Sequence, residues 1–124
     1  MDKLTKKSFL LEIFDYETKD EWNYQGKKPC LIDFHDDTCA PCQAVDPILR
    51  ELSETYSGMI AFYRVDIREE KELTQELGVS NLPTMVLCPM DDKPVVLQGA
   101  ASKEKIKQAI DNELLKDKST SGNE

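Results

Sequence analysis

The sequence predicts a single α/β domain in which a mostly parallel β-sheet is flanked by helices. Short apolar runs alternate along the chain with longer stretches of helical periodicity, which is typical of this fold class. The run over 30–35 is almost continuously apolar, as expected of a central strand buried on both faces. A chain of 124 residues, 40% of them hydrophobic, is long enough for one core. We expect the domain to span 1–116 and the polar tail, 117–124, to be disordered.

Hydrophobic periodicity and turn residues indicate the individual elements. In chain order these are a strand within 8–16, a helix over 19–24, a strand over 30–35, a helix over 40–57, a strand over 59–67, a helix over 69–77, strands over 85–88 and 95–97, and a last helix. The first segment is rich in Phe, Leu and Ile, which favours a strand. In the long helix, Ala44, Ile48 and Leu52 recur at four-residue steps, and Pro47 removes one backbone hydrogen bond.

Glycines and short polar residues mark the ends of the predicted elements. Gly58 and Gly78 follow two of the helices, where a left-handed residue commonly ends the helix. Asp91 and Asp92 form a short polar turn, which predicts an antiparallel hairpin between the last two strands. Ser102 is expected to cap the last helix. The resulting order is βαβαβαββα.

Charge and hydropathy narrow the classes of partner. The net charge of −8 disfavours nucleic acid and anionic membranes, because both bind basic surfaces. No apolar run approaches the roughly 20 residues of a membrane-spanning helix. Glu12 and Asp15 interrupt the apolar stretch near the N-terminus, and no cleavage site follows, so it does not read as a secretory signal. We therefore expect a cytoplasmic protein, while a leader removed from this sequence stays open.

Two of the four cysteines form a Cys-Ala-Pro-Cys motif over 39–42, at a predicted strand-to-helix junction. Such a pair is a redox dithiol or half of a metal site. A zinc or iron–sulfur site would need two more ligands from Cys30, Cys88 and His35. The two further cysteines lie in apolar runs and are better explained as small core residues. The sequence therefore favours redox chemistry, with no metal and no cofactor.

The position of the motif at a helix start suggests different roles for the two thiols. If Cys39 is the N-cap, the Cys42 N–H is available to its sulfur, whereas Pro41 has no N–H to give. A Cys39 thiolate would then be stabilised by that amide and by the helix dipole. We expect Cys39 to attack and the less accessible Cys42 to resolve the mixed disulfide. Asp36 and Asp37 oppose this stabilisation, but we still expect Cys39 to ionise below an ordinary thiol.

Asp33 is a charged residue in a strand that is predicted to be buried. Such a group is costly unless it is neutral or paired. It could pair with Arg64 in the neighbouring strand, or take the proton of Cys42 with a pKa kept near neutral by burial. The two roles are compatible, and we favour the catalytic one. His35, the only histidine, is interpreted as a surface or strand-end residue rather than a catalyst.

Over about residues 28–115 the chain resembles the thioredoxin family. The resemblance implies the thioredoxin fold, with about five strands and about four helices. The matching features, in order, are the strand 31–34, the motif 39–42, Pro47 in the following helix, the loop 79–84 and Gly99.

The resemblance also implies roles for individual residues. Cys39 would be the nucleophile, Cys42 the resolving thiol and Asp33 the buried acid, with Pro83 in cis next to the dithiol. The Leu82 backbone would pair with an extended segment of the substrate. The expected substrate-binding residues are Thr38, Ala40, Pro41, Leu82, Pro83 and Gly99.

Several positions depart from the family pattern. Thr38 replaces a tryptophan, Ala40 a glycine and His35 an aromatic residue, so we expect a different choice of substrate. Arg64 replaces the usual lysine and cannot give up its proton, which favours an ionised Asp33.

Together these features predict a monomeric thiol–disulfide oxidoreductase that reduces disulfides in protein substrates. Leu82 resembles the aliphatic residue of reducing members of the family. The type of reductase that supplies its electrons is unknown. One alternative is a disulfide oxidant or isomerase. The other is a non-catalytic binding or adaptor module that uses the groove at Leu82 and Pro83 without turnover.

Overall fold

A computed structural model describes residues 1–115, and the expected tail, 117–124, lies outside the described residues. A single five-stranded sheet has the order β1-β3-β2-β4-β5. Its strands are β1 (Asp2–Lys3), β2 (Cys30–His35), β3 (Ala61–Asp66), β4 (Thr84–Cys88) and β5 (Val95–Gln98). β2 pairs in parallel with β3 and antiparallel with β4, so the sheet is mixed.

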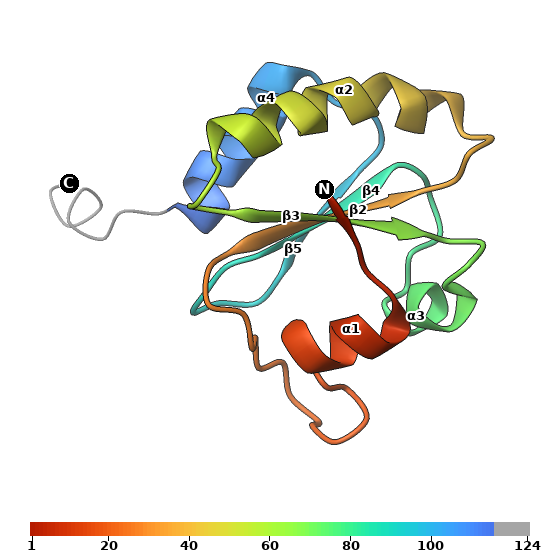
Figure 1. The fold of residues 1–124 in the computed structure, drawn as a ribbon, viewed down its shortest axis with the longest axis vertical. Coiled ribbons are helices and arrows are strands. Elements are labelled where there is room, and N and C mark those ends of the chain that lie inside the picture. The colour runs from red at the N-terminus through yellow and green to blue at the C-terminus, as the bar shows by residue number, and fades with distance from the viewer. Residues whose placement is uncertain (116–124) are drawn as a thin grey trace, which may run out of the picture.

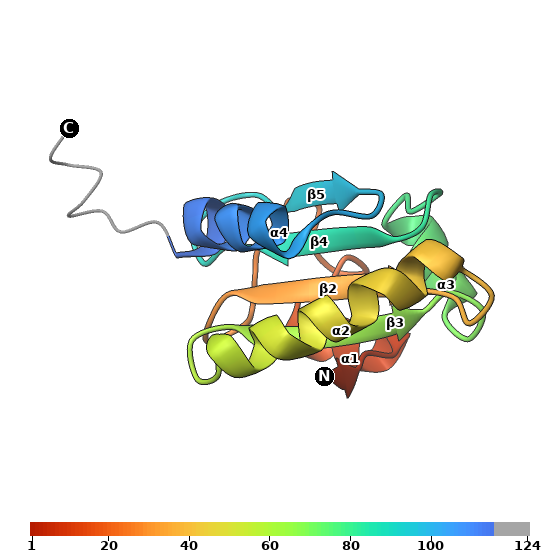
Figure 2. The ribbon, with the colours of Figure 1, turned by 90° about the horizontal axis from the view of Figure 1, so that it is seen from above.

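Helices cover both faces of the sheet, as Figures 1 and 2 show: α2 and α4 lie on one face, and α1 and α3 lie on the other. The helices are α1 (Lys6–Glu12), α2 (Ala40–Thr55), α3 (Lys71–Glu76) and α4 (Lys103–Ala109), which continues into the π-helical segment η1 (Ile110–Leu114). Alternate residues of β2 enter the two cores: Leu31 packs with Leu49 of α2, and Ile32 packs with Phe9 of α1. The predicted fold class is therefore confirmed.

The prediction of a strand within 8–16 is wrong, because the segment forms helix α1. Thr5 begins this helix with a capping box: its side chain accepts from the Ser8 N–H at 3.1 Å, and Ser8 Oγ accepts from the Thr5 N–H at 2.9 Å. Phe9 and Ile13, one helical turn apart, are buried, while Leu11 between them is 66% exposed. This helical spacing outweighs the strand propensity of the individual residues.

The prediction of a helix over 19–24 is also wrong, because this segment is a loop. Trp22 packs on Phe14 with 4.8 Å between ring centroids, and Tyr24 stacks parallel to Trp22 at 6.5 Å. The Tyr24 hydroxyl donates to the Lys28 carbonyl at 2.5 Å. Two large aromatic residues two positions apart do not share one face of a helix, and here the loop places them in one stack.

From β2 onward the predicted elements are present, with ends shifted by a few residues. Gly78 has φ +71° just beyond α3, as expected of a residue that ends a helix. The hairpin of β4 and β5 is antiparallel. Ser102 caps α4 by accepting from the Lys105 N–H at 3.1 Å. Within 1–115, none of the helices has the length and apolar character that a membrane span needs.

Candidate active site

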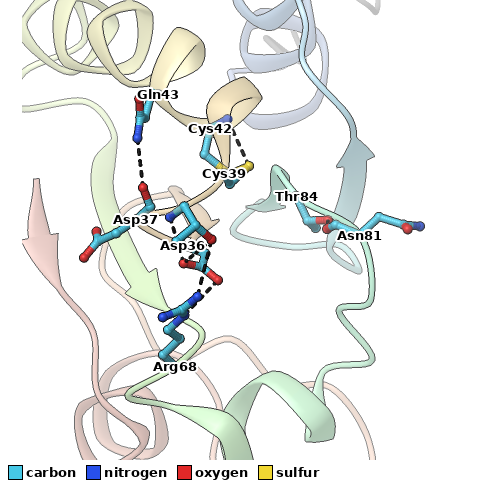
Figure 3. Close-up of a disulfide and its surroundings, with 9 residues drawn as sticks. Asp36, Asp37, Cys39, Cys42, Gln43, Arg68, Asn81 and Thr84 are labelled. Atoms are coloured by element: carbon cyan, nitrogen blue, oxygen red, sulfur yellow. Dashed lines mark hydrogen bonds and ion pairs between the residues drawn. A yellow bond between two sulfur atoms is a disulfide. The ribbon is translucent and has the colours of Figure 1, made fainter.

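The dithiol lies where β2 leads into α2. Cys39 is the N-cap of α2, its sulfur is bonded to that of Cys42, and it also accepts from the Cys42 N–H at 3.1 Å (Figure 3). Cys39 is half-buried, whereas Cys42 is only 5% exposed. The sequence predicted this capping geometry, since Pro41 leaves Cys42 as the N–H donor. An accessible sulfur at the start of a 16-residue helix is thus paired with a buried one.

The negative charges of the two acidic residues before Cys39 act on its sulfur less strongly than the sequence suggests. Asp36 accepts from the Thr38 N–H at 3.0 Å and forms an ion pair with Arg68 at 3.1 Å. The Thr38 N–H and the Arg68 guanidinium lower the pKa of Asp36. In Figure 3 the Asp37 carboxylate points away from the disulfide, while Gln43 binds the Asp37 carbonyl. Arg68 therefore offsets the charge of Asp36, although the two residues are 32 positions apart in the sequence.

This geometry predicts that reduced Cys39 reacts as a thiolate at an unusually low pH. The Cys42 N–H and the positive end of α2 stabilise negative charge on its sulfur. Iodoacetamide alkylation against pH should have a midpoint below ~8.5, the value of a free thiol. Arg68→Gln should raise that midpoint, because Asp36 loses its ion-pair partner. A wild-type midpoint at or above ~8.5 would contradict the helix-dipole argument.

Asp33 lies in the middle of β2, beneath the dithiol, and is only 2% exposed. It lines a cavity of about 160 Å³ together with Cys42, His35, Asp46 and Arg64. Burial raises the pKa of Asp33 to about 7, Arg64 opposes this rise and Asp46 adds to it. Arg64 therefore does favour an ionised Asp33, as expected, but desolvation outweighs the guanidinium and leaves the pKa raised.

An ion pair between Asp33 and Arg64, one of the two roles considered for Asp33, is absent among the described residues. The two residues are register partners in β2 and β3, as expected. However, the ion pair of Arg64 within the described residues is with Asp46, at 3.9 Å between Nη2 and Oδ1. Asp33 Oδ1 has no hydrogen-bond partner among residues 1–115.

The loop before β4 meets the dithiol at the same edge of the sheet, since Thr84 of β4 is opposite Phe34 near the end of β2. The Leu82–Pro83 peptide bond is cis. The Leu82 N–H and C=O make no hydrogen bond within 1–115. Gly99 has φ +88° and donates its N–H to the Pro83 carbonyl at 2.8 Å. Leu82 thus presents free backbone groups beside the dithiol.

The other three expected substrate-binding residues surround Cys39 directly. Thr38 precedes it, and Ala40 and Pro41 form the first turn of α2; all three are exposed. Thr38 Oγ1 is 3.4 Å from Arg68 Nη2, which donates to it. The structure therefore brings every residue of the expected substrate surface to one end of the molecule, and their roles stay predictions.

Comparison with known proteins agrees with this geometry. The family model of thioredoxin matches residues 12–112. A thioredoxin of Borreliella burgdorferi is 36% identical over 107 residues, which cover 86% of this chain and 92% of that protein. Thioredoxin C-2 of Corynebacterium nephridii is 31% identical, with 89% and 93% covered. The chain belongs to the thioredoxin family. With its cysteine pair at disulfide distance, this thioredoxin-family protein is a thiol–disulfide oxidoreductase.

The two remaining cysteines lie apart from the thioredoxin-type dithiol. Cys30 and Cys88 are opposite each other in β2 and β4 and are fully buried, as expected of core residues. Cys30 begins β2 and Cys39 follows its end, so about 16 Å of strand separates them. The two buried cysteines are therefore too far away to complete a metal site at the dithiol.

His35 ends β2, as expected, but it is buried rather than on the surface, with 7% exposure. Burial lowers its pKa, and the Arg64 guanidinium lowers it further. The imidazole is therefore neutral at pH 7. It contributes polarity, but no charge, to the wall of the cavity behind the thioredoxin-type dithiol.

Two residues of this thioredoxin-family site were not identified from the sequence. Asp46 lies four positions after Cys42 on the same face of α2, and this spacing could have indicated it. Arg68 follows β3 and reaches Asp36 only because β2 and β3 are neighbours in the sheet. No local pattern in the sequence indicates that contact.

Proposed function

We propose that this protein reduces disulfides in other proteins. The observation that carries the proposal is the asymmetry of the dithiol: an accessible Cys39 sulfur that accepts the Cys42 N–H, and a buried Cys42. The Cys39 thiolate attacks one sulfur of a substrate disulfide, forms a mixed disulfide and releases the other substrate sulfur as a thiolate, which takes up a proton from water. Cys42 then attacks Cys39 Sγ, releases the second substrate thiol and leaves a Cys39–Cys42 disulfide.

We propose that Asp33 accepts the proton that Cys42 loses in the second step. Cys42 must lose its proton before it attacks, and Asp33 lines the same cavity. A carboxylate with a pKa of about 7 is partly ionised at neutral pH, so it accepts that proton and later returns it to the departing substrate thiolate. The role needs a group that titrates near the working pH, which burial provides.

The substrate surface is proposed to bind an extended segment of the target protein. Unpaired backbone groups of Leu82 support this, because an extended chain adds to such groups as a strand does. Thr38, Ala40 and Pro41 expose small side chains on this surface, of which the Thr38 side chain is polar. We further propose that the protein works in the cytoplasm as a monomer. A reductase of unknown type would re-reduce it there. We propose that the protein uses no metal or cofactor and that its partners are neither nucleic acids nor membranes.

The reduction potential tests the direction of the exchange. The protein is equilibrated with glutathione, and the mass shift on alkylation of free thiols measures the reduced fraction. The resulting potential should be about −270 mV, as in reducing members of this fold. A value near about −120 mV would instead support the oxidant, which is the second candidate among enzymes.

Turnover separates the enzyme from a binding module. With dithiothreitol as electron donor, the protein should reduce insulin disulfides much faster than dithiothreitol does alone. A rate equal to that of dithiothreitol alone would favour an adaptor that binds through the surface at Leu82 and Pro83 without reducing its partner.

A further inference from the structure

The cavity behind the dithiol contains several polar atoms that the protein itself leaves without hydrogen bonds. It is lined by residues of β2, β3, the loop after β2 and the first turns of α2, and has a volume of about 160 Å³. Asp33 Oδ1, His35 Nε2, Asp46 Oδ1 and Arg64 Nε all lie in residues of its wall and have no hydrogen-bond partner within 1–115. A cavity this polar and this large has room for water.

Arg64 has two carboxylates within its reach in this cavity. Its register places it directly opposite Asp33 in the neighbouring parallel strand. Its guanidinium nevertheless pairs with Asp46, at 3.9 Å. Asp46 also binds Arg50 at 2.8 Å through its other oxygen, Oδ2, so it is held on α2 between two guanidinium groups. The Arg64 guanidinium could therefore pair with either Asp33 or Asp46, and in this structure it pairs with Asp46.

We propose that Asp46 is a positioning residue for the dithiol chemistry: it holds the Arg64 guanidinium away from Asp33, so that this carboxyl stays free to exchange a proton with Cys42. This proposal rests on the proposed role of Asp33, and it identifies Asp46 as the residue that keeps the Asp33 carboxyl able to exchange a proton. In this proposal Asp46 takes no part in the reaction itself and acts through Arg64.

The charges around Asp33 support this assignment. The ionisable groups that line the cavity with it come from β2, β3, α2 and the intervening loop: His35, Arg64, Cys42, Asp46, Asp36 and Asp37. Asp66 of β3 lies opposite His35 in the register. From β4 the register partner of Asp33 is Met85, which carries no charge. Of these groups, Arg64 lowers the pKa of Asp33 and Asp46 raises it. A guanidinium moved onto Asp33 would hold this carboxyl ionised and unable to accept a proton.

The direct test is the titration of Asp33 in the reduced, full-length protein, followed by the ¹³C NMR signal of its carboxyl. Asp46→Asn keeps the size of the side chain and removes the attraction for Arg64. We expect the Asp33 midpoint to fall by about one pH unit, the low end of the effect of a nearby opposite charge. The pH profile of mixed-disulfide resolution should shift in the same direction.

Two matched variants control for other effects of the change. Asp37→Asn removes the charge of another residue that lines the cavity but forms no ion pair with Arg64 among residues 1–115, and it should move the Asp33 midpoint far less. Arg50→Gln removes the other partner of Asp46 but keeps its charge, so the midpoint should not fall. If either variant matches Asp46→Asn, the effect is not specific and the proposal fails.

A double variant distinguishes positioning from simple charge repulsion. Arg64→Met should raise the Asp33 midpoint, and in that background Asp46→Asn should have a clearly smaller effect. An equal shift in both backgrounds, or none in the wild type, would overturn the proposal. The titration needs no turnover, so a protein that fails to reduce insulin but titrates as described would contradict the proposed function alone.

Discussion

Changing Cys42 to serine should trap the protein on its substrates as a covalent mixed disulfide. The first step needs only Cys39, which lies half-buried at the start of α2, and it would proceed as before. The second step needs a thiol at the buried position, and a serine hydroxyl does not attack a disulfide at neutral pH. Non-reducing electrophoresis and mass spectrometry with insulin as substrate should show a complex that dithiothreitol releases.

Cys39→Ser is the matched control, because it removes the other sulfur of the same pair. It should form no covalent complex and should reduce insulin no faster than dithiothreitol alone. If this variant traps substrate and Cys42→Ser does not, the roles of the two thiols are exchanged. If neither variant forms a complex, the protein binds without exchange and the adaptor alternative gains support.

The dithiol was predictable because its chemistry is encoded within a few residues. A proline between two cysteines at a helix start leaves one N–H for capping, and the structure has that hydrogen bond at 3.1 Å. Asp33 was predictable for the same reason, since a charged residue in an apolar strand is conspicuous on its own. Its environment was not. Whether Arg64 pairs with Asp33 or Asp46 depends on how α2 packs over β3, and no pattern in the sequence reveals that packing.

The first two elements were mispredicted because local composition misled in both cases. Strand β1 has only two residues, Asp2 and Lys3, and owes its existence to pairing with β3. No periodicity reveals so short an element. The apolar residues over 8–16 have the composition of a strand, although the spacing of Phe9 and Ile13 fits a helix. The order of element types agrees with the prediction only because β1 and α1 take the places of the two mispredicted elements.

The ionisation of Asp33 should make the stability of the protein depend strongly on pH. Its pKa is about 7 in the folded protein and about 3.9 in the unfolded chain, so the folded state binds more protons between these values. Stability therefore falls as the pH rises from about 4 to about 7, by roughly 4 kcal/mol in total, and stays low above that range. Asp33→Asn should remove this fall. Its free energy of unfolding should exceed that of the wild type by several kcal/mol at pH 8.

Urea unfolding of the oxidised protein at a series of pH values measures this effect, because the Cys39–Cys42 disulfide removes both thiols from the titration. At pH 4.5 the free energies of unfolding of the two proteins should differ little, since Asp33 is then protonated in the folded wild type and its burial costs little stability. Asp37→Asn changes an exposed carboxylate nearby and should leave the pH dependence as it is in the wild type. An equal gain from Asp33→Asn at pH 4.5 and pH 8 would assign the gain to packing. It would also remove the basis for Asp33 as a proton acceptor near neutral pH.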